Sequence, residues 1–262
     1  MAAAALSGSA STVFFVLSAA FAAGFIDSIV GGGGLIQVPA LLTAYPDVAA
    51  SDLLGTNKFG SIFGTTSSVA RYARFVRIPW RMLLPAGGCG FLAAVLGASL
   101  VSQVPSAVFR PMVPVALAAV LVYVLTHKDL GAVHAPLQLD VRRRLLGMLG
   151  VAGIGVYDGF FGPGTGSFLM LLYVRVHGFD FLNAAAAARL VNVATNAGAL
   201  TYFGLHAHIH WSIGAGLGLC NASGSIVGVR TARRHGGKFV RRVFIAVVSA
   251  LIAKTAWDGL RG

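Results

Sequence analysis

The chain has 262 residues, of which 56% are hydrophobic and only 11% are charged. That composition excludes an ordinary water-soluble domain, in which about a quarter of the residues are charged, and it indicates an integral membrane protein. A formal net charge of +12 would point to nucleic acid in a soluble protein, but in a membrane protein it indicates cytoplasmic loops beside an anionic lipid surface, with no nucleic-acid partner.

Apolar segments of membrane-spanning length recur along the chain. We expect them to be helices, because every backbone polar group that faces lipid must be paired internally. They lie at about 11–29, 53–76, 82–102, 108–126, 145–161, 184–205, 211–229 and 243–257. Two further apolar stretches, 34–44 and 165–176, are too short to cross alone. No basic segment precedes the first run, so we expect no cleaved signal peptide.

The second half of the chain repeats the first with a constant shift of 131 residues. The shift carries Asp27 onto Asp158, Trp80 onto Trp211, Cys89 onto Cys220, Arg110 onto Arg241 and Gly24–Gly33 onto Gly155–Gly164. Internal repeats in an apolar chain are typical of transporter folds. We therefore divide one membrane domain into a first repeat, residues 1–131, and a second repeat, residues 132–262.

Basic residues are distributed oppositely in the connecting loops of the two halves. The connection at 71–81 carries four arginines, whereas its counterpart at 202–212 carries none. The connection at 230–242 carries six basic residues, whereas its counterpart at 99–111 carries one. Because basic loops stay on the cytoplasmic side, equivalent loops should face opposite sides of the membrane. The basic run at 142–144 should lie inside.

Opposite orientation requires an odd number of crossings in each half. The helix at 184–205 joins a cytoplasmic linker to an outer loop, so the apolar residues before it must enter and leave on the same side. We interpret 145–176 as a re-entrant hairpin broken at Gly162–Gly166, and 11–44 as its counterpart from the outer face, broken at Gly31–Gly34. The prediction is an all-α membrane protein with two inverted-topology repeats. Each has a re-entrant helical hairpin and about three spanning helices, and both termini lie outside. The alternative is full crossing by both glycine segments, which would make the halves parallel.

The glycine clusters have a physical use at the hairpin tips. Glycine permits backbone angles closed to other residues, and the helix that begins after each break presents free amide hydrogens and the positive end of its dipole, which favour an anion. A nucleotide phosphate loop is the rival interpretation, but no strand precedes the clusters and no Gly-Lys-Ser/Thr follows them. The candidate tip ligands are Gly32, Gly33, Gly34, Gly164, Thr165 and Gly166.

Polar side chains share one helical face in each half. Lys58, Ser61 and Thr65 recur at steps of three and four, next to Asn57. The repeat places Arg189, Asn192 and Asn196 at the same positions. A charge at membrane depth costs about 2.5–3.5 kcal/mol on insertion scales, so it usually has a partner or a function. We expect these residues to bind an anion; the alternative is that both cations extend to the headgroups.

Two carboxylates, Asp27 and Asp158, lie four residues before the glycine breaks. They could neutralise the two cations, cap the hairpin tips or carry a coupling proton. We favour a structural role, because both halves carry the residue next to the same break. Further candidates for lining the cavity are Gln37, Thr65 and Tyr157.

Neither the histidines nor the cysteines form a ligand pattern. His206, His208 and His210 alternate in the predicted outer loop without a fourth ligand, so we expect no metal. Cys89 and Cys220 lie in apolar segments, and neither belongs to a Cys-x-x-Cys pair. We expect them to be small buried hydrophobic residues, and we expect no cofactor.

Five motifs carry a family resemblance. They are Gly24-Phe-Ile-Asp27-Ser-Ile-Val-Gly-Gly-Gly-Gly34, Val38-Pro39-Ala-Leu41, Thr56-Asn57-Lys58, Tyr157-Asp158-Gly-Phe-Phe-Gly-Pro-Gly-Thr-Gly166 and Arg189-Leu-Val-Asn192-Val-Ala-Thr-Asn196. Across essentially the whole chain they resemble the sulfite exporter TauE/SafE family. The resemblance implies a multi-pass permease of the cell inner membrane that exports sulfite, sulfoacetate or related small sulfur-containing anions. Where many relatives have lysine, this chain has Arg189, which keeps the cation but changes its geometry.

We therefore expect a secondary transporter, not an enzyme, that exports a sulfite-like anion or an organosulfonate by alternating access. Because no nucleotide-binding motif is present, we expect coupling to an ion or proton gradient, or facilitated diffusion. An anion channel, an intramembrane thiol-redox protein that uses the two cysteines and a structural membrane subunit remain as alternatives. The transported anion, the coupling ion, the direction and a homodimeric state stay open.

Overall fold

The computed structural model describes residues 9–101, 134, 135, 137 and 140–261. Within these residues the structure is all-helical, with eight helices and no strand. The predicted helix at 108–126, which includes Arg110, and the proposed boundary between the repeats at 131 lie outside the described residues.

The described helices follow the predicted apolar segments. In the first half they are α1 (Ala10–Val30), α2 (Gly34–Ala44), α3 (Ala50–Tyr72) and α4 (Trp80–Ser99). In the second half they are α6 (Val141–Phe160), α7 (Thr165–His177), α8 (Phe181–His206) and α9 (Trp211–Arg261). The two short stretches at 34–44 and 165–176 are helices, as predicted.

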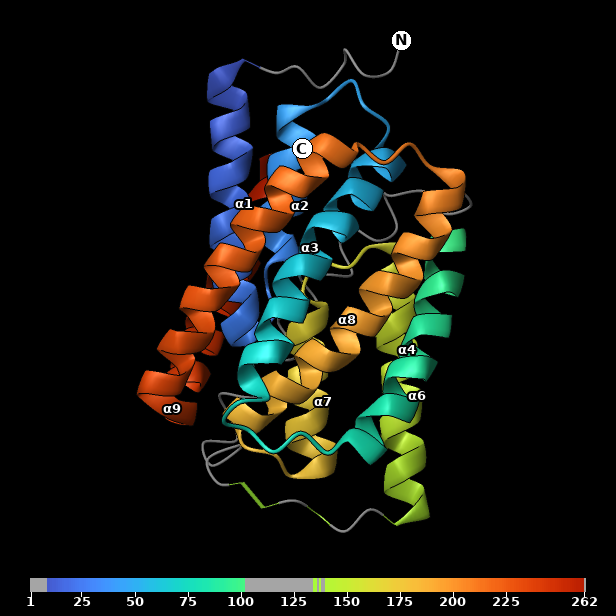
Figure 1. The fold of residues 1–262 in the computed structure, drawn as a ribbon, viewed down its shortest axis with the longest axis vertical. Coiled ribbons are helices and arrows are strands. Elements are labelled where there is room, and N and C mark those ends of the chain that lie inside the picture. Colours follow the sequence, from blue (N-terminus) through green and yellow to red (C-terminus); the bar gives the residue numbers. More distant parts are fainter. Residues whose placement is uncertain (1–8, 102–133, 136, 138–139, 262) are drawn as a thin grey trace.

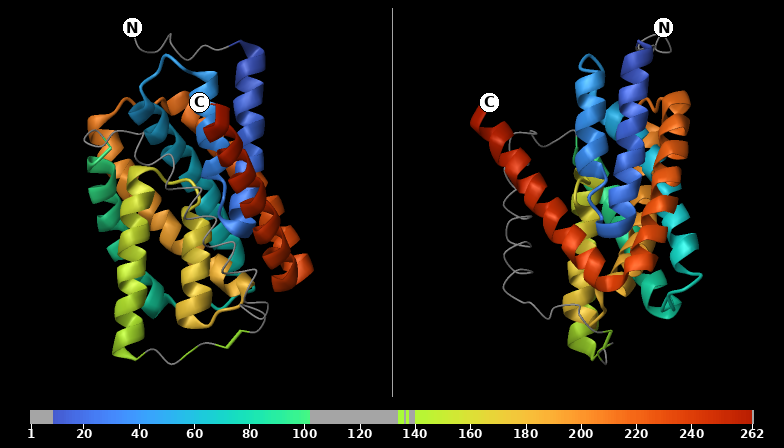
Figure 2. Two further views of the ribbon diagram at one scale, coloured as in Figure 1. Left: turned by 180° about the vertical axis from the view of Figure 1, so that it is seen from behind. Right: turned by 90° about the vertical axis from the view of Figure 1, so that its left-hand side faces the viewer.

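Helix α9 consists of two helices that meet at a kink, as predicted, but the basic connection at 230–242 differs from the expected loop. The connection is itself helical, and the only non-helical residue inside α9 is Gly236, with φ 71° and ψ −174°. Arginine and lysine favour helix, so the charged run continues the helix until a glycine permits the left-handed angle. Figure 2 shows α9 bending sharply at this point and returning along the molecule.

Several helix starts are fixed by side chains that cap them. Asp140 Oδ1 accepts a hydrogen bond from Arg143 N at 2.8 Å at the start of α6. Asp180 Oδ1 accepts one from Asn183 N at 2.7 Å at the start of α8. Aspartate is among the preferred residues at this position because it satisfies an otherwise free amide.

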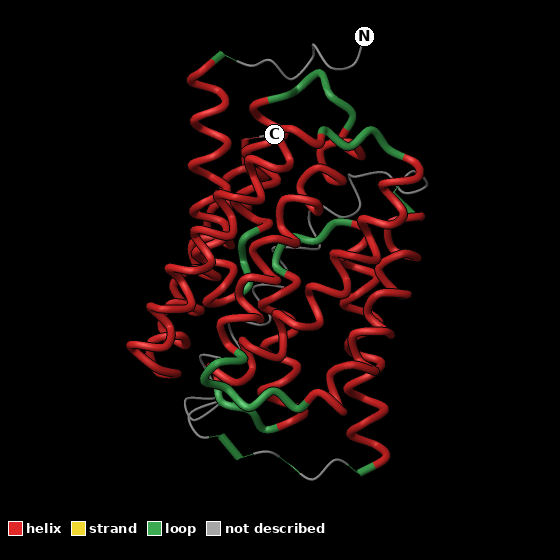
Figure 3. The backbone as a smooth tube through the Cα atoms, viewed as in Figure 1, coloured by secondary structure: helices red, strands yellow, loops and turns green. Residues whose placement is uncertain are grey.

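Helices related by the 131-residue shift run in opposite directions in Figure 1. There α1 and α3 descend, whereas their counterparts α6 and α8 ascend; α4 ascends, whereas the first part of α9 descends. Figure 3 shows the α1–α2 and α6–α7 breaks as two short loops near the middle of the molecule. Each pair of helices around a break therefore enters the molecule and turns back halfway.

The two halves interlock. Helix α9 packs on α1 and α3 of the first half, and its counterpart α4 packs on α6 and α8 of the second half, while α3 contacts α8 in the centre. Glycines permit these close approaches: a methyl group on Gly24 would overlap the carbonyl of Asn221, and one on Gly159 would overlap that of Ala94. Small residues at such crossings are typical of helices that pack within a membrane.

Three described helical segments have both the length and the hydropathy of membrane spans: Ala10–Val30, Trp80–Ser99 and Trp211–Val247. Helices α3, α6 and α8 are also 20 residues or longer, but they contain more polar and charged residues. Large apolar side chains such as Phe14, Leu92 and Leu219 are exposed on the outside, as expected where the surrounding medium is lipid.

Charge is concentrated at one end of the molecule. The α3–α4 connection, the start of α6 and the bend in α9 all lie at the lower end in Figure 1, and they carry the arginines of 71–81, 142–144 and 230–242. The α8–α9 connection at the opposite end carries histidines instead. The basic loops thus face one side.

We predict that Gly159→Ala lowers the melting temperature of the purified protein in detergent. The added methyl group collides with the main chain of α4, and overpacking of this kind costs about 1–3 kcal/mol. The matched control is Gly153→Ala on the same helix, where nothing lies within 4 Å and alanine favours helix. Equal melting temperatures for the two variants would contradict the packing described here.

Candidate functional site

The site is built on two backbone turns that meet in the middle of the molecule. Gly31, Gly162 and Gly164 all have positive φ, at 89°, 92° and 88°, so a side chain at any of them would be strained. A methyl group on Gly31 would overlap the backbone of Gly166. The two tips therefore touch main chain to main chain.

Side chains hold the tips in place. The Tyr157 hydroxyl donates to Pro163 O at 2.5 Å, and the Ser167 hydroxyl donates across the two halves to Val30 O at 2.8 Å. Tyr157, which we expected to line the cavity, is therefore bonded to the tip and is not among the residues that line the cavity.

Two ion pairs with buried cations cross between the halves. Lys58 Nζ lies 2.7 Å from Asp158 Oδ1, and Arg189 Nη1 lies 2.5 Å from Asp27 Oδ2. The 131-residue shift relates one pair to the other, so each cation meets the carboxylate of the opposite half. Lys58 and Arg189 are both buried, so the alternative in which the cations extend to the headgroups is wrong.

The two carboxylates differ in their surroundings. Asp158 also accepts hydrogen bonds from Thr165 Oγ1 at 2.8 Å and from Asn192 Nδ2 at 3.3 Å, and its side chain is 2% exposed. In addition to its ion pair, Asp27 accepts a hydrogen bond from Gly33 N at 3.2 Å. Its side chain is 16% exposed. Asp27 is thus the more accessible and the less saturated of the two.

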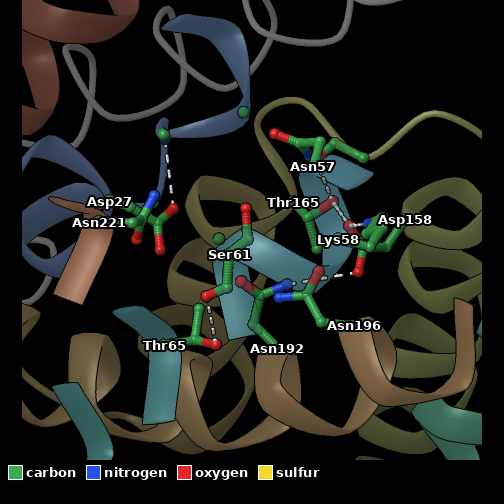
Figure 4. Close-up of a pocket in the computed structure, with 15 residues that line it drawn as sticks. Asp27, Asn57, Lys58, Ser61, Thr65, Asp158, Thr165, Asn192, Asn196 and Asn221 are labelled. Carbon is green, nitrogen blue, oxygen red and sulfur yellow. Dashed lines mark hydrogen bonds and ion pairs between the residues drawn. The ribbon is translucent and has the colours of Figure 1, made fainter. Parts of the chain in front are cut away.

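Between the tips and the ion pairs lies a cavity of about 30 Å³. Figure 4 shows its polar side chains converging from several helices. It is lined by Asp27, Gly31, Gly33, Gly34, Asn57, Lys58, Ser61, Thr65, Asp158, Gly162, Thr165, Gly166, Asn192, Asn196 and Asn221. Twelve of the residues that we singled out from the sequence are therefore brought together around one space.

Other candidate residues lie just outside this lining. Gly32 and Gly164 belong to the tips but do not line the cavity. Gln37 is fully buried, and its Oε1 accepts a hydrogen bond from Asn221 Nδ2 at 2.7 Å. Arg189 lies behind the second tip, where a methyl group on Gly166 would overlap its Nη2. These residues adjoin the cavity without lining it.

Asn221 is a lining residue that we did not identify from the sequence. It lies on α9, and its counterpart in the first half is Gly90, so comparison of the repeats gives no signal. The sequence does carry one signal, the polarity of Asn221: a polar residue inside an apolar span usually has a functional or pairing role.

The site holds hydrogen-bonding capacity that the protein does not use. Arg189 Nε and Nη2, Asn57 Oδ1 and Gln37 Nε2 are buried without a protein partner. Buried polar atoms are nearly always hydrogen-bonded in folded proteins, so such a cluster beside a cavity indicates a place for a ligand. Nε and Nη2 are the two donors of one guanidinium edge, which binds an oxyanion through two parallel hydrogen bonds.

The histidines and cysteines lie apart from this site. His208 N donates to Asp52 Oδ1 at 3.1 Å and His210 N donates to Thr56 Oγ1 at 3.0 Å, so their loop is held on α3 through its backbone. Among the described residues no group of three or more His, Cys, Asp or Glu could hold a metal ion. Cys89 and Cys220 are free thiols, and neither is among the residues that line the cavity.

The sequence of this chain is similar to a known family of membrane proteins. The model of the family described as Sulfite exporter TauE/SafE matches residues 16–255. The chain is 38% identical over 246 residues to the Probable membrane transporter protein ORF9 of Sinorhizobium sp, covering 93% of this chain and 92% of the relative. It is 34% identical over 252 residues to the Probable membrane transporter protein YfcA of Escherichia coli (strain K12), covering 94% and 89%.

A Probable membrane transporter protein of Haemophilus influenzae is 34% identical over 243 residues, with 91% of this chain and 92% of the relative covered. No solved structure matches the chain. The family match extends over both glycine motifs and both ion pairs. The chain belongs to the sulfite exporter TauE/SafE family of membrane transporters and is a multi-pass protein of the inner membrane.

Proposed function

We propose that this protein is a secondary transporter that exports a small sulfur oxyanion or organosulfonate, such as sulfite or sulfoacetate, by alternating access. The observation that carries the proposal is the two crossed ion pairs with buried cations beside two glycine tips. The description of the family names sulfite export, and the unused guanidinium edge of Arg189 is suited to two oxygens of a sulfur oxyanion.

The size of the cavity favours a moving transporter over an open channel. A volume of about 30 Å³ exceeds what one water molecule needs but leaves no room for an organosulfonate. The unused edge of Arg189 is also covered by Gly166. Entry of the anion therefore requires the tip to move away from Arg189, which couples binding to a conformational change.

The charges of the site support coupling to a proton. Two cations and two carboxylates balance each other, so an added anion leaves an excess negative charge in a medium where unpaired charge is costly. If Asp27 takes up a proton, a monovalent anion, such as the singly protonated form of sulfite, replaces it as the partner of Arg189 and the balance is kept. Asp27 is suited to this role because it is the more exposed carboxylate and has the fewer partners.

Alternating access also fits the arrangement of the halves. Counterpart helices run in opposite directions and the basic loops lie at one end, which supports two inverted-topology repeats with re-entrant hairpins. In such transporters the site lies near the bilayer midplane and one unit rocks against the other. Helix α4 packs on α6 and α8 of the second half, and α9 packs on α1 and α3 of the first half. Movement of either half would therefore carry a helix that contacts the hairpin of the other half.

Paired substitutions separate the structural role of the charges from their role in transport. Arg189→Gln leaves Asp27 unpaired, and breaking a buried pair costs about 3–5 kcal/mol, so we expect a lower melting temperature and little folded protein. The double variant Asp27→Asn/Arg189→Gln removes both charges, so we expect its melting temperature to recover. Its sulfite flux in proteoliposomes should still fall at least about tenfold, because a hydrogen bond to a charged group contributes about 1.5–3 kcal/mol.

The control for this pair is Arg175→Gln, an exposed arginine on α7, which should keep both stability and flux. Sulfite transport by the double variant at the wild-type rate would show that the charges serve the fold alone, and the proposed site would then be wrong.

Single cysteines test the inverted orientation of the halves. Arg77→Cys and His208→Cys, both at exposed positions, are made in a chain in which Cys89 and Cys220 are serine. We expect an impermeant maleimide added outside the cell to label His208→Cys and to leave Arg77→Cys unlabelled until the membrane is opened, since basic loops stay inside. Labelling of both positions from one side would contradict the orientation. Loss of flux in the cysteine-free background would instead support the thiol-redox alternative.

A further inference from the structure

A second, larger cavity lies at the basic end of the molecule, between α4, α6 and α7. Its volume is about 440 Å³, within the range of small-molecule sites. It is lined by Arg81, Met82, Pro85, Ala86, Arg144, Gly147, Met148, Val151, Tyr173 and His177. It shares no lining residue with the central cavity, so the transport site does not account for it.

Two buried polar atoms of this cavity have no protein partner. The Tyr173 hydroxyl and His177 Nδ1 are both unpaired, although Tyr173 is only 1% exposed and His177 only 5%. A methyl group on Gly147 would lie 2.9 Å from His177 Cε1, so a glycine at this position makes room for the imidazole. Two buried polar groups left unpaired in one cavity indicate a ligand that pairs them.

The remaining lining is amphiphilic. Arg81 and Arg144 are exposed side chains from the first turns of α4 and α6, and the wall between them is apolar, with Met82, Met148 and Val151. Beyond the cavity the same helices expose Leu84, Leu145 and Leu149, a surface suited to acyl chains. The two arginines and the two polar groups of the cavity can bind a charged headgroup. The exposed leucines beside it can contact the acyl chains of the same molecule.

The polar residues of this cavity are not repeated by the internal symmetry of the chain. The 131-residue shift carries Arg81 onto Ser212, Arg144 onto Val13, Tyr173 onto Leu42 and His177 onto Pro46. None of these counterparts is charged, so these four positions form no equivalent anion site. A site for a molecule confined to one leaflet needs no counterpart at the other end of the molecule.

We propose that this cavity binds the phosphate headgroup of an acidic membrane lipid. Arg81 and Arg144 bind the phosphate, while Tyr173 and His177 donate hydrogen bonds to its oxygens from inside the cavity. Basic pockets between transmembrane helices on the cytoplasmic side are known to favour such headgroups, and this cavity lies at the end where the arginine-rich loops gather. The bound lipid ties α7, the second arm of the hairpin, to α4 and α6.

The test uses the full-length purified protein and measures retention of phosphatidylglycerol by native mass spectrometry in detergent, with phosphatidylcholine for comparison. Arg81→Gln/Arg144→Gln should weaken phosphatidylglycerol binding roughly 30-fold, since each basic residue near an acidic headgroup contributes about 1 kcal/mol. The matched control is Arg74→Gln/Arg142→Gln, which removes two exposed arginines from the same end but outside the cavity. It should change the affinity less than about threefold.

A third variant, Tyr173→Phe, removes only the unpaired hydroxyl. Because that hydroxyl has no protein partner, the melting temperature without lipid should not fall. The rise in melting temperature caused by added phosphatidylglycerol should become smaller than in the wild-type protein. This difference distinguishes a headgroup ligand from a hydroxyl that is merely tolerated in the core.

Three results would overturn the proposal. Equal loss of phosphatidylglycerol from both double variants would mean that general charge attracts the lipid. Protection by inorganic phosphate equal to that by phosphatidylglycerol would make a free anion the occupant. A raised KM for sulfite in the Arg81→Gln/Arg144→Gln variant, measured in phosphatidylcholine alone, would assign the cavity to the substrate pathway.

Discussion

The fold depends on two ion pairs that neither half can complete alone. Lys58 meets Asp158 and Arg189 meets Asp27, so the charge that one half brings into the core is neutralised only by the other. An uncompensated buried charge costs several kcal/mol, which makes correct association of the halves a condition for folding. The same arrangement gathers four charged groups beside the two helix breaks, where a small anion can exchange partners with them.

The glycines make this arrangement possible by removing side chains where main chains must meet. Gly31 and Gly166 bring the two tips into contact, and Gly24 and Gly159 bring α1 against α9 and α6 against α4. Asp27 caps its own tip through Gly33 N, and Asp158 receives the Thr165 hydroxyl. The carboxylates therefore neutralise the cations and fix the tips at once, which joins two of the roles that the sequence left as alternatives.

The sequence was sufficient to predict the described helices and most of the residues that line the cavity, but not which cation pairs with which carboxylate. Apolar runs locate the helices because burial and hydropathy act locally, and the 131-residue shift identifies Lys58 and Arg189 as related. The crossing of the pairs depends on how the tips pack, which links residues 100 and 162 positions apart. Asn221 was missed because its counterpart is Gly90. The helical course of 230–242 on both sides of the Gly236 kink was missed because this basic segment was taken for a loop.

The differences between the two halves are as relevant to the proposed transport as their similarity. Two inverted halves with identical chemistry would give the inward-open and outward-open states equal free energy. Here Asp158 has three side-chain partners and is buried, whereas Asp27 is partly exposed. The two arginines of the larger cavity have uncharged residues at their counterpart positions. In the proposed transport cycle these differences decide which state the empty protein prefers and which carboxylate exchanges its proton. The ion gradient still sets the net direction, because a difference in resting state cannot drive flux by itself.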